Sequence, residues 1–226
     1  MNANAKPGQW LIVLGAGGGL GHFAGGTPFL FFLDVFRDDT SPLFVLRCDD
    51  LSRPKVQLLK VSLVQYARAQ GVQVIGIDGG DEKGTFVKSI GAEKYIDFTK
   101  TTDLVQEVIK ITGGGAHAVI VTAGNAKAFV SAAEMLRVRG TLSCVGIPPG
   151  KAVIETGVST IVIKGLHITG NLVGSLKECL EAVDFVRRGV VKSMVSVRPF
   201  RDLPQAYEDM EKGNVMGRIV LKIAKE

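Results

Sequence analysis

A chain of 226 residues is long enough for one large domain, or for one domain and part of a second. Its 46% hydrophobic and 22% charged residues are typical of a globular protein and exclude an intrinsically disordered chain. The net charge of +5 comes from scattered Lys and Arg residues, which argues against a nucleic-acid-binding protein.

The cysteines and the apolar stretches indicate in which compartment the chain is found and whether it spans a membrane. Cys48, Cys144 and Cys179 lie too far apart for a disulfide framework or a zinc cluster, and they suit a reducing compartment such as the cytoplasm. The apolar stretch Phe29–Phe36 contains Asp34 and is far shorter than the roughly 20 residues of a membrane-spanning helix. No signal peptide is visible, so we expect neither secretion nor a membrane.

The first predicted strand, Trp10–Leu14, runs directly into a glycine-rich turn, Gly15–Gly21. Glycines there allow a tight turn and let the backbone approach a diphosphate, which would lie at the N–H groups of the helix start. The spacing Gly15-x-x-Gly18-x-x-Gly21 is a variant of GxGxxG. Alone it is a weak sign of a dinucleotide site, and a plain flexible turn stays open as an alternative.

A dinucleotide site also needs an acidic residue about 20 residues further on, at the end of the next strand. The candidate is Asp78, which ends the predicted strand 72–78 but lies much further from Gly21. Removing residues 25–63 restores the expected distance and the helical spacing of the apolar residues on either side. We therefore predict that residues 25–63 interrupt one strand–helix–strand unit, and that a helix beginning at Pro54 replaces the interrupted one. A natural long loop and a retained intervening sequence are both open explanations.

Strands and helices then alternate along the chain, which is typical of an α/β fold with a doubly wound parallel sheet. The expected helices are 83–91, 102–115 (capped by Thr102 or Asp103), 126–140, 158–165 and 175–189. The expected strands between them are 94–98, 116–124, 141–150 and 166–174. Ligands of such a sheet lie at the carboxyl ends of its strands.

Past Gly189 the pattern changes to two predicted strands, 191–200 and 216–224, which flank a helix at 203–213. This tail looks like a piece of another domain. The histidines, His22, His117 and His167, have no carboxylate or cysteine neighbours at ligand spacing, so we expect them to pack or to lie on the surface.

Six segments of the chain, taken together, resemble one family: the zinc-dependent alcohol dehydrogenases among the medium-chain dehydrogenases. The segments are KPGQWLIVLGAGGGLGH, VIGIDGG, YIDFT, GGGAHAVIVTAG, GTLSCVGIPPG and KGLHITGNLVG. The resemblance covers nearly everything except residues 25–63. It implies an NAD-binding Rossmann domain over residues 1–189 and a C-terminal remnant of the catalytic domain at 190–226. The implied reaction is hydride transfer between a primary alcohol or aldehyde and NAD.

The resemblance also implies the cofactor contacts. The residues expected to cradle the diphosphate are Gly18, Gly19 and Leu20, with Arg218 reaching a phosphate from the tail. The residues expected near the adenosine are Asp78, Lys83 and Phe98, and those near the nicotinamide are Val145, Ile147, Asn171 and Val173. A carboxylate at Asp78 accepts hydrogen bonds from ribose hydroxyls and repels a 2′-phosphate, which favours NAD over NADP.

One departure from the family bears on activity. The family carries the Cys and His ligands of its catalytic zinc in an N-terminal domain, and this sequence starts where that domain would already have ended. We therefore expect no metal ligands and little or no activity of this chain alone. The alternatives are a zinc-independent quinone or enoyl reductase and a non-catalytic NAD-binding module. The resemblance further implies a homo-oligomer paired through the sheet edge near Leu166–Gly174.

Overall fold

The computed structural model describes residues 3–17, 61–172, 174–192, 194–212 and 214–223. Its main body is a parallel sheet with the strand order β3-β2-β1-β4-β5-β6, which confirms the predicted doubly wound α/β fold. The strands are β1 (Trp10–Leu14), β2 (Gln73–Asp78), β3 (Lys94–Asp97), β4 (Ala116–Val121), β5 (Leu136–Cys144) and β6 (His167–Gly170).

Strand β1 lies in the middle of the sheet. Its residue Ile12 pairs with Ile75 of β2 on one side and with Val119 of β4 on the other. A strand in this position is covered by neighbours on both edges and by helices on both faces, so it needs an apolar residue at almost every position. The run WLIVL meets that need.

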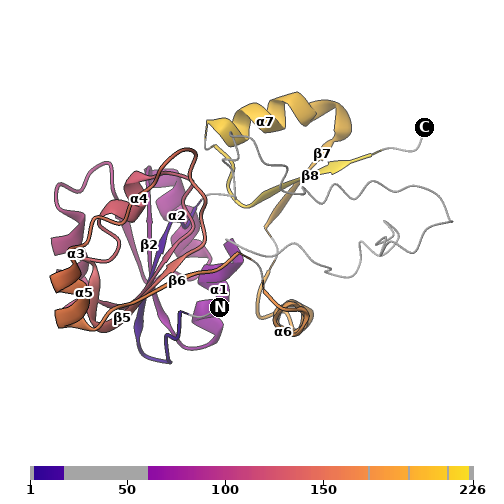
Figure 1. The fold of residues 1–226 in the computed structure, drawn as a ribbon. Coiled ribbons are helices and arrows are strands. Elements are labelled where there is room, and N and C mark those ends of the chain that lie inside the picture. Colours follow the sequence, from indigo (N-terminus) through magenta and orange to yellow (C-terminus); the bar gives the residue numbers. More distant parts are fainter. Residues whose placement is uncertain (1–2, 18–60, 173, 193, 213, 224–226) are drawn as a thin grey trace.

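Helices cover both faces of the sheet (Figure 1). On one face, α1 (Val61–Ala69) and α2 (Asp81–Ser89) bury Val64 and Val87 against the alternate strand residues Leu11, Val13 and Val74. On the other face, α3 (Leu104–Thr112), α4 (Lys127–Val130) and α5 (Val158–Lys164) pack over the opposite set, which includes Ile12, Ile75 and Val119. The alternation of β1 and β2 side chains thus fills two separate cores.

The ends of α3 follow the prediction closely. Asp103, one of the two expected caps, accepts a hydrogen bond from the Gln106 N–H at 2.9 Å, and Gly113 ends the helix with a φ of 67°. A left-handed residue at this position suits glycine because it has no Cβ to clash.

The helix predicted at 126–140 is wrong. The helix α4 ends at Val130, a turn follows, and β5 already begins at Leu136. Residues Ala132, Ala133, Met135 and Leu136 are all buried, and a run this apolar satisfies a helix and a buried strand equally well. The register of β5 on β4 also shifts in this region, where Arg139 has a φ of 60°.

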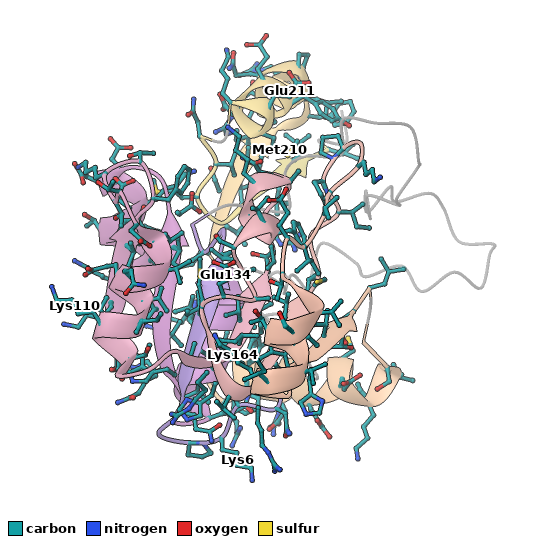
Figure 2. The ribbon with its side chains drawn as sticks, turned by 60° about the vertical axis from the view of Figure 1, so that its left-hand side comes forward. Lys6, Lys110, Glu134, Lys164, Met210 and Glu211 are labelled. Carbon is teal, nitrogen blue, oxygen red and sulfur yellow. The ribbon has the colours of Figure 1, made fainter. Side chains whose placement is uncertain are left out.

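Helix α5 forms as predicted and is tied to the start of β5. The Lys164 Nζ donates to the carbonyl oxygens of Leu136 at 2.9 Å and Glu134 at 3.3 Å; Lys164 and Glu134 are labelled in Figure 2. The helix contains no buried residue and lies on the outside of the fold.

Helix α6 (Leu176–Arg187) begins with a capping box formed by Ser175 and Glu178. It is fastened to α1, because the Tyr66 hydroxyl donates to the Ala182 carbonyl at 2.8 Å and the Tyr66 and Phe185 rings meet edge to face. Burial raises the pKa of Tyr66 to about 12, so this hydroxyl stays protonated as a donor. The helix itself was predicted, but of its apolar stripe only Val186 is buried, whereas Leu176 is 76% exposed.

The tail forms the predicted strand–helix–strand unit. Strands β7 (Val195–Pro199) and β8 (Arg218–Lys222) pair in parallel, and between them lie a 3-10 turn η2 (Phe200–Asp202) and α7 (Leu203–Glu211). These strands make their own two-stranded sheet, which Figure 1 shows apart from the six-stranded one.

Residues 25–60 of the predicted insertion lie outside the described residues, as do residues 54–60 of the helix predicted from Pro54. Residues 61–63 belong to α1, and Leu63 is buried in the core that α1 and α2 share. The unit β1–α1–β2 therefore closes as one parallel crossover, although residues 18–60 separate β1 from α1 in the sequence.

Candidate functional site

The turn after β1 is shaped by glycine. Gly15 has a φ of 84°, and its N–H donates to the Ile77 carbonyl at 2.8 Å. A Cβ at Gly15 would lie 3.1 Å from the Ala123 backbone, so the turn packs tightly against the chain that follows β4. Two residues further on, the Gly17 N–H donates to the Asp78 side chain at the end of β2.

The Asp78 carboxylate lies directly against this turn. Asp78 ends β2, is 8% exposed, and accepts hydrogen bonds from the Gly17 N–H (2.9 Å, Oδ2) and the Gly79 N–H (2.9 Å, Oδ1). The Lys83 Nζ is 3.1 Å from Oδ1. Asp78 thus lies beside the glycine turn, and Lys83 is brought to the same carboxylate.

Strand β3 supplies the outer wall of this region. The ring of Phe98, which is 52% exposed, packs beside Gly79: a Cβ on Gly79 would lie 3.2 Å from it. Asp97 accepts from the Gly80 N–H at 3.1 Å, and the Tyr95 hydroxyl donates to the Gly80 carbonyl at 2.9 Å. Sequence reasoning included Phe98 but missed Tyr95 and Asp97. The available signal was the strand YID, in which Tyr95 and Asp97 are alternate residues and therefore lie on the same face.

Electrostatics around Gly80 are dominated by carboxylates. Burial, and then the charges of Asp78, Asp97 and Asp81, raise the pKa of Tyr95 well above its usual value. The Thr99 hydroxyl, which donates to Asp97 at 2.6 Å, is the main cause that lowers the pKa of Asp97. Tyr95 therefore remains a donor and Asp97 remains ionised at neutral pH.

The ends of β4, β5 and β6 form the other half of the edge. The Thr122 hydroxyl donates to the Leu14 carbonyl at 2.8 Å, and the Val145 N–H to the Val121 carbonyl at 3.0 Å. After β6, the Asn171 N–H donates to the Cys144 carbonyl at 2.9 Å and its Nδ2 to the Ser143 hydroxyl at 2.8 Å. Val145 and Asn171 are thereby fixed at neighbouring strand ends.

An open hollow of about 270 Å³ lies on this side of the sheet. Phe129, Gly146, Ile147, Ala152 and Ile154 contribute to its lining. The wall is largely apolar, and Ile147 keeps 46% of its surface exposed. Such a hollow suits a flat ring more than a charged group.

Not all predicted site residues are brought together. Arg218 lies on β8, in the two-stranded sheet, and burial lowers the pKa of its guanidinium. Gly18, Gly19, Leu20 and Val173 lie outside the described residues. The grouped residues are therefore Asp78, Lys83 and Phe98 at one half of the edge, and Val145, Ile147 and Asn171 at the other.

Two absences hold for the part of the chain that the structure describes. It contains no group of three His, Cys, Asp or Glu side chains that could hold a metal ion. None of its helices combines the length and the apolar character that crossing a membrane requires. The imidazole of His117 is half-buried, and its Nδ1 accepts from the Trp10 N–H at 3.2 Å, whereas His167 is exposed.

The family model described as zinc-binding dehydrogenase matches residues 61–188. The chain belongs to the zinc-binding dehydrogenase family. The matched range holds Asp78, Lys83, Phe98, Val145 and Asn171. The family model therefore covers the strand ends that carry these candidate site residues.

Two curated relatives are alcohol dehydrogenases of fungi. Alcohol dehydrogenase 1 of Emericella nidulans is 37% identical over 223 residues, which are 98% of this chain and 52% of that protein. The alcohol dehydrogenase of Schizosaccharomyces pombe is 34% identical over 219 residues, 97% of this chain and 51% of that protein. The chain thus spans about half the length of the curated relatives it matches.

Solved structures agree on the fold. An alcohol dehydrogenase from Aeropyrum pernix superposes with a TM-score of 0.73 at 21% identity, covering 97% of this chain and 52% of that one. The quinone oxidoreductase of Escherichia coli, solved with NADPH, gives a TM-score of 0.67 at 21% identity over 95% of this chain and 57% of that one. Both alcohol and quinone oxidoreductases therefore share this architecture.

Proposed function

We propose that this chain is the NAD-binding portion of an alcohol dehydrogenase, and that the Asp78 carboxylate recognises the adenosine ribose. The observation that carries the proposal is the contact between the first glycine turn and the acid that ends β2. Asp78 Oδ2 accepts one hydrogen bond among the described contacts, from Gly17, so this oxygen keeps acceptor capacity for a ribose hydroxyl. This acceptor therefore fits a nucleotide whose ribose hydroxyls are free to donate.

The other predicted residues take matching roles in this proposal. Lys83 steadies the Asp78 carboxylate, and the exposed ring of Phe98 flanks the adenine. Val145, Ile147 and Asn171 border the nicotinamide half, and Gly18, Gly19, Leu20, Val173 and Arg218 are kept as proposed contacts. Bound NAD would accept the hydride. In the reaction proposed for the alcohol dehydrogenase to which this portion belongs, a primary alcohol is oxidised to an aldehyde.

We propose little or no alcohol turnover by this chain on its own. The family carries zinc, but the described residues offer no three-ligand group for it, so no step of the chemistry is assigned to them. Wide spacing of Cys48, Cys144 and Cys179 supports a cytoplasmic location. We also keep the division into residues 1–189, interrupted at 25–63, and a tail at 190–226 as a proposal.

A second candidate is a zinc-independent reductase of quinones or enoyl compounds, because the fold is shared with quinone oxidoreductases. The quinone oxidoreductase of Escherichia coli was solved with NADPH, whose 2′-phosphate would meet the Asp78 carboxylate here. That repulsion disfavours the reductase. A non-catalytic NAD-binding module would share the preference for NAD and stays as an alternative.

We further propose that two copies of the chain pair through β6, the edge strand of the sheet that the structure describes, in the range Leu166–Gly174. Ile168 on β6 is exposed, and so are Val158, Val162 and Ile163 on α5. An edge strand with apolar neighbours is a ready site for strand pairing.

The test is a titration with NADH and NADPH. The single tryptophan, Trp10, lies on β1 and provides a donor for energy transfer to a bound reduced nicotinamide. Tighter binding of NADH than of NADPH, without ethanol oxidation even when zinc is added, is expected. A preference for NADPH together with quinone reduction would move the assignment to the second candidate, and ethanol turnover would refute the proposed inactivity.

A further inference from the structure

The turn that follows Asp78 has no side chains of its own. Its two residues are Gly79 and Gly80, and their N–H groups are held by two different carboxylates. Asp78 accepts from Gly79 at 2.9 Å, and Asp97, from the neighbouring strand, accepts from Gly80 at 3.1 Å. The Tyr95 hydroxyl holds the Gly80 carbonyl at 2.9 Å, so β3 grips both backbone groups of Gly80.

Gly80 matters because it is the N-cap of α2. It provides no side-chain cap, so its position depends on what holds its backbone. Lys83 lies in the first turn of α2, and its Nζ is 3.1 Å from Asp78 Oδ1. Holding Gly80 therefore also holds Lys83 against the carboxylate that is proposed to bind the ribose.

Asp97 also adds a fixed negative charge. Asp78 and Asp97 are direct partners in the register of β2 and β3, so both carboxylates come to the same end of the sheet. The Asp97 side chain is only 9% exposed, and it accepts from the Thr99 N–H at 2.9 Å and the Thr99 hydroxyl at 2.6 Å. The Lys100 Nζ lies 3.9 Å from Asp97 and is bound more closely to Asp81, at 2.6 Å.

We propose, resting on the NAD-binding function above, that Asp97 is a positioning residue that sets the preference for NAD over NADP. It holds the Gly80 turn, which keeps Lys83 on Asp78, and its charge adds to that of Asp78 in repelling a 2′-phosphate. Removing Asp78 alone frees the Lys83 ammonium but leaves the Asp97 charge, so the discrimination against NADPH is only partly lost.

The experiment measures dissociation constants for NADH and NADPH in the full chain and three variants: Asp97→Ala, Asp78→Ala and the double variant. We expect Asp97→Ala to weaken NADH binding severalfold and to lower the NADH preference about tenfold, since a like charge close to a phosphate is removed. The double variant is expected to bind NADPH better than Asp78→Ala does. An NADH preference unchanged by Asp97→Ala overturns the inference.

The matched control is Asp103→Ala, which also removes a carboxylate that accepts a backbone N–H at the start of a helix, but on α3. It is expected to cost stability without changing the NADH preference; a shift equal to that of Asp97→Ala would reduce the role of Asp97 to stability and overturn the inference. If Asp97→Ala unfolds, Asp97→Asn preserves the shape and an acceptor for Thr99, and the same loss of preference is expected. Failure of the unmodified chain to bind NADH would reject the proposed function itself, whereas binding with an unchanged preference in the Asp97 variants rejects this inference alone.

Discussion

The Asp78 carboxylate joins three segments of the chain: the turn after β1 through Gly17, its own strand end through Gly79, and α2 through Lys83. These contacts orient the carboxylate before any nucleotide arrives. Preorganisation of this kind lowers the entropy lost on binding. The same residue therefore contributes to the closure of the crossover and, in the proposed function, also to recognition of the nucleotide.

Replacing Asp78 should consequently weaken NADH binding strongly. Asp78→Ala removes an ionised acceptor, and hydrogen bonds to charged groups contribute about 1.5–3 kcal/mol, so we expect a loss of about tenfold to a hundredfold in affinity. Fluorescence titration measures it. Glu134→Ala, an exposed carboxylate near the start of β5, serves as the control and should leave affinity unchanged. Equal affinity of Asp78→Ala and the unmodified chain would contradict the ribose role.

His117 should make the stability depend on pH. Burial and then the nearby Arg137 lower its pKa, and its Nδ1 accepts from the Trp10 N–H. The folded state therefore binds this proton less readily than the unfolded state, and stability falls as pH drops below about 6.5. We expect the melting temperature to rise between pH 5 and 7.

The variant His117→Asn tests that assignment, because its side-chain oxygen can accept from Trp10 but does not titrate in this range. Its melting temperature should depend less on pH between 5 and 7 than that of the unmodified chain. Parallel pH profiles would mean that another group is responsible.

At the scale of elements, α1 is the helix of the β1–α1–β2 crossover and packs on both strands of that unit. Leu63 lies on this helix and is buried, together with Val64, in the core that α1 shares with alternate side chains of β1 and β2. Leu63→Ala should therefore lower the free energy of unfolding by about 2–5 kcal/mol, as expected when a buried leucine is truncated. Denaturant unfolding measures this loss. The exposed substitution Arg68→Lys on the same helix should change it by less than about 0.5 kcal/mol.

The close approach of β4 and β5 at their carboxyl ends depends on Gly146. A Cβ there would collide with the Ala123 carbonyl oxygen, whereas a Cβ on Gly170, at the end of the adjacent β6, would meet open space. Gly146→Ala should lower the free energy of unfolding by about 1–3 kcal/mol and weaken NADH binding, because the strand ends must move apart. Gly170→Ala is the matched control, and similar losses in both variants would contradict this explanation.

Most elements could be predicted because glycine turns and apolar runs mark them in the sequence. The helix from Thr102 and the tail strands are examples. The exception was the segment 126–140. Its buried residues Ala132, Ala133, Met135 and Leu136 fit both helix and strand, and the left-handed Arg139 carries no sequence signal. At the site, Asp78 was identified because it ends a predicted strand, and its distance from the glycine turn fits once residues 25–63 are removed. The contacts of Tyr95 and Asp97 with Gly80 depend on cross-strand register, which the sequence does not reveal.

At the scale of the whole molecule, β6 is the last strand of the sheet that the structure describes, and our proposal is that copies of the chain associate through this edge. We expect Ile168→Lys to shift the chain toward the monomer in light scattering, because an edge lysine opposes strand pairing and adds charge to an apolar surface. Lys177→Ala, on α6, is the control and should leave the mass unchanged. A monomeric unmodified chain would refute pairing through this edge.

The central place of β1 has a consequence for biosynthesis. Its partners β2 and β4 both follow it in the sequence, with Leu11 of β1 aligned to Ala118 of β4. A ribosome therefore releases the most apolar strand of the sheet long before either neighbour exists. Contacts between such distant residues form slowly, and nascent WLIVL is a natural target for a chaperone until synthesis has passed Val121.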